Sequence, residues 1–268
     1  MDKLVRKKIP VVSGAIRNYY KYLERRQLRR SDHVITITDD FNPLLVSSFG
    51  VPESKVTAIP NWAPLDSLPV ETKANGWAQA HDLADKFVFL YTGTLGMKHN
   101  PALLRDLAKS MRPHPKARVV VISEGLGADW LMAEKSAAGG GLDNLMVMPY
   151  QPFESLPQVL GAGDCLIAVL EEDAGIFSVP SKVLTYLCAG KPLLLACPQV
   201  NLAARIVREN EAGLVVAPSD LRGFLDNAAK IYGDIKLSEK FGENSRNYAE
   251  STFNICDIAL KFENVIKN

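Results

Sequence analysis

The feature that most constrains this chain is a regular alternation of short apolar runs with helical patterns, which begins at residue 87. Six runs of aliphatic and β-branched residues are bounded by turn residues, and each is typical of a buried strand. They span residues 87–91 (FVFLY), 117–122 (ARVVVI), 145–148, 165–170, 192–196 and 213–216. Helical patterns lie between them. Strands that alternate with helices across short connections predict an α/β fold, with a doubly wound parallel sheet covered on both faces.

The first part of the chain follows another pattern. Residues 1–62 predict a helix at 16–28, a helix at 40–49, and strands at 33–38 and 55–59. Two strands are too few to close a core, so we expect residues 1–62 to be a remnant of a second Rossmann-like domain.

Composition then divides the rest of the chain. Residues 63–84 are polar and contain proline, which is typical of a linker. Residues 85–250 would form the ligand-binding sheet domain, and residues 251–268 a C-terminal helix.

Composition excludes several classes of protein. No apolar run approaches the ~20 residues of a membrane-spanning helix, and the N-terminus lacks the apolar stretch of a signal peptide. The four cysteines and four histidines show no metal-ligand spacing. We therefore expect a cytoplasmic protein that uses neither a metal ion nor another cofactor.

Charge is distributed unevenly along the chain. Residues 1–31 hold ten basic residues and two acidic ones. Such a basic end favours an anionic partner, such as a membrane surface or a phosphate-bearing molecule, although a solvated helix face has the same composition. Nucleic acid is not expected, because the aromatic residues among these basic ones are confined to Tyr19, Tyr20 and Tyr22.

Two glycine-containing turns follow predicted strands. In YTGTLGMKHNP, Gly96 and Lys98 lie just before a helix, where backbone N–H groups and a cation suit a phosphate. In ISEGLGADWL, the loop that begins at Ser123 could lie against a nucleotide base. Neither turn matches the spacing of an established phosphate motif, and an ordinary glycine turn explains each one alone.

A third segment, EEDAGIFSVPSKVLTYLCAGKP, spans residues 171–192. Here a strand ends in three carboxylates, and a helix then begins near Ser181. Lys182 would lie in the first helical turn, where a cation opposes the helix dipole unless an anion binds. The segment predicts a phosphate site, with a plain helix start as the alternative.

Taken together, the segments resemble the family-4 retaining glycosyltransferases of the two-Rossmann-domain (GT-B) type, and within them the capsule, O-antigen and colanic-acid branch. The similarity covers about residues 20–250, in the order of the family. It rests on RRSDHVITITDDF, KVTAIPNW, FLYTGTLGMKHN, VVVISEGLG, MPYQPFESLPQVLGAGDCLIAVL, VPSKVLTYLCAGKPLL and AGLVVAPSD.

This resemblance implies a site for a UDP-sugar or a GDP-sugar. The donor diphosphate would meet Gly96, Lys98, Ser178, Val179, Ser181 and Lys182. The nucleoside would meet Ser123, Glu124, Gly125, Pro149, Tyr150 and Thr185. Catalytic residues on the acceptor side would belong to a domain that is mostly absent, so none is assigned.

The chain departs from the family in three ways. The family carries two glutamates eight residues apart, and Phe177 and Thr185 occupy those positions here. Thr94 replaces a basic residue. Family members also have a complete N-terminal Rossmann domain, onto which the helix at 251–268 would cross, so we expect a truncated or split enzyme.

The resemblance therefore implies a retaining glycosyltransferase in surface polysaccharide biosynthesis, with a lipid-linked acceptor at the inner membrane face. Two alternatives stay open. The chain could bind a nucleotide-sugar without transferring it unless a separate chain supplies the missing domain, or it could be a sugar-nucleotide epimerase of related fold.

Overall fold

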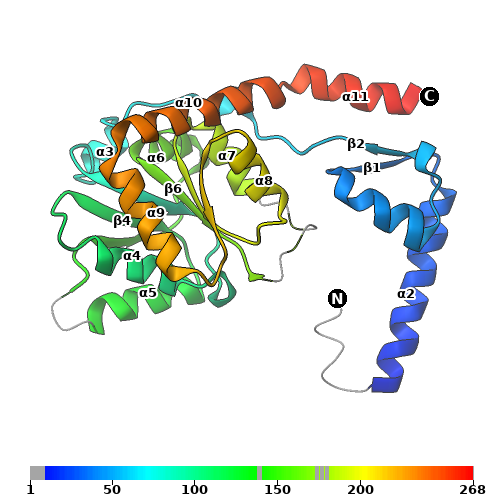
Figure 1. The fold of residues 1–268 in the computed structure, drawn as a ribbon, viewed down its shortest axis with the longest axis horizontal. Coiled ribbons are helices and arrows are strands. Elements are labelled where there is room, and N and C mark those ends of the chain that lie inside the picture. Colours follow the sequence, from blue (N-terminus) through cyan, green and yellow to red (C-terminus); the bar gives the residue numbers. More distant parts are fainter. Residues whose placement is uncertain (1–9, 138–140, 173–174, 176–177, 179–180, 268) are drawn as a thin grey trace. The chain divides into compact units, whose positions relative to one another are not determined.

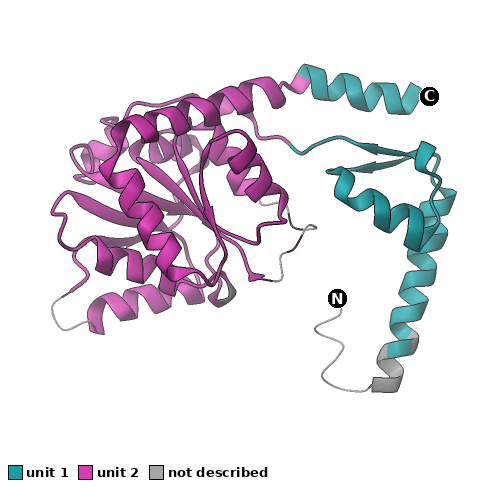
Figure 2. Ribbon diagram, viewed as in Figure 1, with its two compact units in different colours: residues 1–61, 256–268 teal, residues 62–255 magenta. Residues whose placement is uncertain are grey.

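The computed structural model describes residues 10–137, 141–172, 175, 178 and 181–267. The chain divides into two compact units (Figure 2). The large unit spans residues 62–255, and the small unit combines residues 1–61 with residues 256–268.

The large unit is built on a parallel sheet of six strands (Figure 1). Their order across the sheet is β5-β4-β3-β6-β7-β8. The chain starts at the centre with β3, moves outward through β4 and β5, and returns to β6 on the other side of β3. This reversal confirms the predicted doubly wound sheet, and all six strands occur where the sequence predicts them. Their bounds are β3 (Phe87–Thr92), β4 (Ala117–Ile122), β5 (Leu145–Met148), β6 (Cys165–Val169), β7 (Leu193–Ala196) and β8 (Gly213–Val216).

Helices cover both faces of this sheet, because side chains alternate along each strand. In β3, Val88 and Leu90 face one core cluster, and Phe89 and Tyr91 face the other. The first cluster includes residues of α3 (Gly76–Ala80), α6 (Leu156–Ala162), α7 (Ser181–Cys188), α8 (Leu202–Glu209) and α10 (Ile235–Thr252). The second includes residues of α4 (Ala102–Ser110), α5 (Leu126–Ala137) and α9 (Leu221–Gly233).

The segment that we expected to be a linker, residues 63–84, packs into the large unit. Leu68, Trp77 and Leu83 are buried in the first core cluster. Asn75 caps the short helix α3 by accepting a hydrogen bond from the N–H of Ala78. Polar and proline residues dominate the segment in sequence, yet most of its large apolar side chains pack in or against the core, and Val70 stays exposed.

The small unit holds a sheet of two parallel strands, β1 (Val34–Thr36) and β2 (Val56–Ala58). The helix expected at residues 40–49 is confirmed as an unbroken helical segment, in which a 3-10 turn, Asp39–Phe41, continues through residues 42–43 into a π-helical turn, Leu44–Phe49. Pro43 has helical backbone angles, φ −58° and ψ −38°, and lies just before the π-helical turn, near the start of the segment, where a proline is tolerated. The unit also holds α2 (Pro10–Arg30), and α11 (Ile255–Lys267) lies almost entirely within it.

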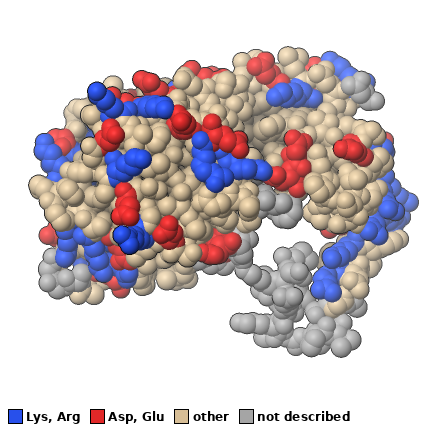
Figure 3. Space-filling view, viewed as in Figure 1, with Lys and Arg blue, Asp and Glu red and all other residues tan. Residues whose placement is uncertain are grey.

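Basic side chains gather along α2, as Figure 3 shows. Its lysine and arginine residues are all exposed, and so are Tyr19, Tyr20 and Tyr22. Arg29 donates a hydrogen bond to the carbonyl of Phe49, which ties the helix to the turn at 44–49. Within the described ranges, no helix has the length and apolar character needed to cross a lipid bilayer.

Two helical glycines, Gly242 in α10 and Gly233 at the end of α9, differ in how closely other atoms pack around them. A Cβ atom at Gly242 in α10 would lie 2.6 Å from the carbonyl oxygen of Gly190, whereas one at Gly233 would meet nothing within 4 Å. We expect Gly242→Ala to lower the free energy of unfolding by about 1–3 kcal/mol through overpacking. Gly233→Ala should leave it unchanged or raise it by up to ~1 kcal/mol. Urea unfolding measures both, and equal values for the two variants would contradict this packing.

Candidate functional site

The candidate site lies at the carboxyl edge of the six-stranded sheet. Its predicted residues follow β3, β4, β5 and β6, and these strands are neighbours in the sheet. Because the strands are parallel, the loops after them emerge at the same edge. The two central strands, β3 and β6, pair directly and continue in opposite directions across the sheet, which is where ligands of doubly wound folds bind.

The loops after β3 and β4 are fastened to each other. The N–H of Leu95 donates to Ser123 Oγ at 3.1 Å, and the N–H of Gly127 donates to the carbonyl of Leu95 at 3.1 Å. A Cβ atom at Gly127 would lie 2.2 Å from that carbonyl oxygen, so only glycine allows this approach. Ser123 is buried, and its hydroxyl therefore serves to hold the two loops together.

The loop after β5 joins the same group. The N–H of Tyr150 donates to Glu124 Oε1 at 3.1 Å, and its hydroxyl donates to Thr94 Oγ1 at 3.4 Å. The ring of Tyr150 is 46% exposed. Gly125 has a φ of +92°, which favours glycine, and open space lies where its Cβ would be. Tyr150, Gly125 and the adjoining Pro149 therefore form an accessible surface beside the β3 loop.

Lys182 lies in the first turn of α7. Its Nζ atom is 3.9 Å from the centre of the Tyr91 ring, a cation–π contact. The same atom would lie 3.3 Å from a Cβ at Gly93, whose φ is +104°. Burial lowers the pKa of Lys182 to about 8. No carboxylate of the described residues pairs with this ammonium group, so α7 presents a desolvated cation to the end of β3.

Two further tyrosines fix the end of β3. The Tyr186 hydroxyl accepts a hydrogen bond from the N–H of Thr92 at 2.9 Å and donates to the carbonyl of Thr92 at 3.2 Å. The Tyr91 hydroxyl donates to the carbonyl of Thr94 at 2.7 Å. Burial raises the pKa of both phenols, that of Tyr186 to about 12, so both stay neutral.

Some predicted residues already have partners within the chain. The N–H of Gly96 donates to His99 Nδ1 at 3.1 Å. The Thr185 hydroxyl donates to the carbonyl of Ser181, one helical turn earlier, at 3.3 Å. Ser178 is exposed, while Val179 and the side chain of Lys98 lie outside the described parts of the chain.

Sequence reasoning missed Tyr91, Tyr186 and Asn201. Asn201 is completely buried, and its side chain reaches the loop after β6. The two tyrosines look like ordinary core residues, because each continues the apolar pattern of its element. Only the position of Asn201, just before a helical pattern, is a recognisable sequence signal, and it indicates a helix cap.

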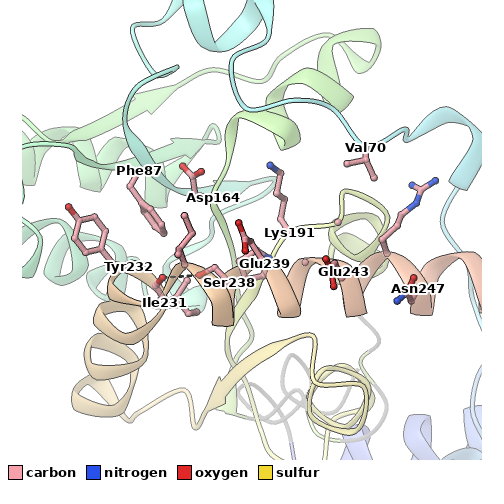
Figure 4. Close-up of a pocket in the computed structure, with 15 residues that line it drawn as sticks. Val70, Phe87, Asp164, Lys191, Ile231, Tyr232, Ser238, Glu239, Glu243 and Asn247 are labelled. Atoms are coloured by element: carbon pink, nitrogen blue, oxygen red, sulfur yellow. Dashed lines mark hydrogen bonds between the residues drawn. The ribbon is translucent and has the colours of Figure 1, made fainter.

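A cavity of about 740 Å³ lies elsewhere, at the amino edge of the sheet. Figure 4 shows its lining: Phe87 at the start of β3, Asp164 and Lys191 ahead of β6 and β7, and a row of α10 residues. None of the predicted site residues lines it. The described residues also contain no cluster of three His, Cys, Asp or Glu side chains that could hold a metal ion.

Two curated proteins are similar to this chain over most of its length. The putative colanic acid biosynthesis glycosyl transferase WcaI of Escherichia coli (strain K12) is 25% identical over 259 residues, which cover 95% of this chain and 61% of that protein. The alpha-D-kanosaminyltransferase of Streptomyces kanamyceticus is 21% identical over 230 residues, 84% of this chain and 57% of that protein. The chain therefore spans about three fifths of the length of these relatives.

Solved structures show the same fold. Anabaena Alr3699/HepE in complex with UDP has a TM-score of 0.74 at 14% identity, covering 92% of this chain and 67% of that one. WaaG, a glycosyltransferase involved in lipopolysaccharide biosynthesis, has a TM-score of 0.71 at 16% identity, covering 97% and 71%.

The family model described as glycosyl transferases group 1 matches residues 76–248, which include all the predicted site residues. This match covers well over half of the chain, and it confirms the family that the sequence motifs resemble. The chain belongs to the glycosyl transferases group 1 family.

Proposed function

We propose that this chain provides the donor site of a glycosyltransferase that uses a nucleotide-diphosphate sugar in surface polysaccharide biosynthesis. The observation that carries the proposal is the Lys182 ammonium group, which lies at the carboxyl edge of the sheet beside Gly93. Family membership and the similarity to WcaI support sugar transfer. The UDP and UDP-glucose complexes of HepE make a uridine nucleotide the natural first ligand to test.

In this proposal the diphosphate lies between the β3 loop and the start of α7. Its contacts are Gly96, Lys98, Ser178, Val179, Ser181 and Lys182. A helix N-terminus, such as the start of α7, and the Lys182 ammonium both favour an anion. The Gly96 N–H already donates to His99, so it would not donate to the diphosphate. Because Gly96 has no side chain, it would instead let the diphosphate come close to the backbone.

The nucleoside would lie against the β4 and β5 loops. Its contacts are Ser123, Glu124, Gly125, Pro149, Tyr150 and Thr185. The exposed ring of Tyr150 offers a stacking surface, and Glu124 offers a carboxylate to base or ribose donors. Thr185 would contact ribose through a neutral hydroxyl where family relatives carry a glutamate.

The chemistry that we propose is transfer with retention of configuration. The bond between the anomeric carbon and the diphosphate breaks as the acceptor hydroxyl forms its bond on the same face. The leaving diphosphate takes the acceptor proton. Negative charge then develops on the diphosphate, where Lys98 and Lys182 would stabilise it without a metal ion.

The acceptor would be lipid-linked and would lie at the inner face of the membrane. The basic, tyrosine-containing surface of α2 supports this location, because anionic lipid headgroups attract such segments. A second candidate function is donor binding without transfer unless a separate chain supplies an acceptor domain. The two-stranded sheet of the small unit favours this candidate, since so small a sheet closes no core of its own.

Nucleotide titration tests the donor site. Calorimetry with UDP, GDP and ADP should show binding of at least one of them to the wild-type chain. Lys182→Met should weaken that binding by about 1–3 kcal/mol, the value of a charge-assisted contact with phosphate. Lys191→Met is the matched control, because Lys191 is also a half-buried lysine of lowered pKa but lies at the amino edge. No binding of any nucleotide, or equal effects of the two variants, would overturn the proposed site.

The pH dependence of binding gives a second test. Lys182 is charged below its pKa of about 8 and attracts the diphosphate, and it becomes neutral as the pH rises. Tyr91 and Tyr186 beside it stay uncharged in this range. Nucleotide affinity should therefore be about tenfold weaker at pH 9 than at pH 7. In Lys182→Arg the guanidinium remains charged, so the affinity should change little over this range. If the nucleotide affinity of Lys182→Arg fell by the same factor between pH 7 and pH 9, deprotonation of Lys182 would not be the cause of the decline.

Transfer of a radiolabelled sugar separates the two candidate functions. Sugar incorporation by the purified chain with membranes would support a complete transferase. Nucleotide binding without incorporation, restored by an added acceptor domain, would support the second candidate.

A further inference from the structure

Asn201 is a buried residue whose side-chain oxygen and nitrogen are both hydrogen-bonded. Its Oδ1 atom accepts from the N–H of Ala203 at 2.9 Å and so caps α8. Its Nδ2 atom donates to the carbonyls of Gly175 at 2.7 Å and Ser178 at 2.6 Å. Asn201 has no exposed surface. One buried amide therefore joins the start of α8 to two points on the loop between β6 and α7.

A primary amide suits this position, because it offers one acceptor and two N–H donors on one planar group. Loss of the two donors would leave the Gly175 and Ser178 carbonyls without these bonds and would release both points of the chain from α8. Gly175 has a φ of +52°, a left-handed conformation that favours glycine. The tether and the glycine together restrict the backbone at Gly175 and Ser178.

We propose that Asn201 is a positioning residue for the donor site. By holding the Gly175 and Ser178 carbonyls, it sets the path of the chain into α7, where Ser181 and Lys182 would meet the diphosphate of the nucleotide-sugar. Lys182 is only four positions after Ser178, so a shift of the tethered carbonyls would be passed to the start of the helix. The ligand in this inference rests on the proposed function, whereas the tether rests on the contacts of Asn201 alone.

The chain contains a matched control for this residue. Asn75 caps α3 through Oδ1, which accepts from the N–H of Ala78 at 2.9 Å. Its Nδ2 atom donates to the carbonyls of Thr72 at 2.9 Å and Gln158 at 2.8 Å. It is also nearly buried, with 7% of its surface exposed. Asn75 thus makes the same set of bonds as Asn201, but it touches none of the four loops at the carboxyl edge.

The experiment compares Asn201→Ser with Asn75→Ser. Serine still caps a helix but lacks the two amide donors. Both variants should lower the melting temperature by a few degrees. Asn201→Ser alone should weaken UDP binding about tenfold, as expected for two lost hydrogen bonds, and should speed amide hydrogen exchange in residues 171–182. Asn201→Asp keeps the volume and the cap but places a carboxylate against two carbonyls, so it should weaken UDP binding further.

Unchanged loop exchange in Asn201→Ser, or equal losses of UDP affinity in Asn201→Ser and Asn75→Ser, would overturn the inference. The exchange measurement needs no ligand. If the wild-type chain bound neither UDP, GDP nor ADP, the proposed function would fail, and exchange would still decide whether Asn201 holds the loop.

Discussion

Parallel pairing of β3 with both β4 and β6 is the constraint on which the rest of the large unit depends. Phe89 pairs with Cys165 on one side, and Thr92 pairs with Ile122 on the other. This pairing brings residues more than seventy positions apart to one edge of the sheet. Because the chain leaves β3 and β6 in opposite directions, their loops separate and a ligand can approach the strand ends. The candidate donor site is a consequence of this topology.

Buried polar contacts then hold the loops in place. Tyr186 binds both backbone groups of Thr92, Ser123 binds the β3 loop, and Asn201 binds the loop before α7. Each is a buried side chain that hydrogen-bonds to the backbone of a loop or strand end. The groups that would touch a ligand, such as Lys182, are therefore held in place by buried side chains packed behind them.

Two half-buried lysines show how the two edges of the sheet differ. Burial lowers the pKa of both Lys73 and Lys182. Lys73 lies near the amino edge and pairs with Asp164, which also accepts a hydrogen bond from the N–H of Val88. Its charge is thus compensated by the fold. Lys182 faces an aromatic ring instead of a carboxylate, so an incoming anion would provide the compensation that the fold does not.

The sequence by itself determined the six strands, the helices between them and the loops that carry the site, because hydrophobic periodicity and turn residues are local signals. It did not show that the helical segment at residues 40–49 changes from a 3-10 to a π-helical turn, and it gave no sign that Trp77 and Leu68 join the core. Only the tertiary structure decided that Lys182 lies over Tyr91 and that Asn201 holds Ser178. These contacts join residues 23 to 91 positions apart, and no local pattern encodes them. They arise because the parallel sheet brings distant strand ends together.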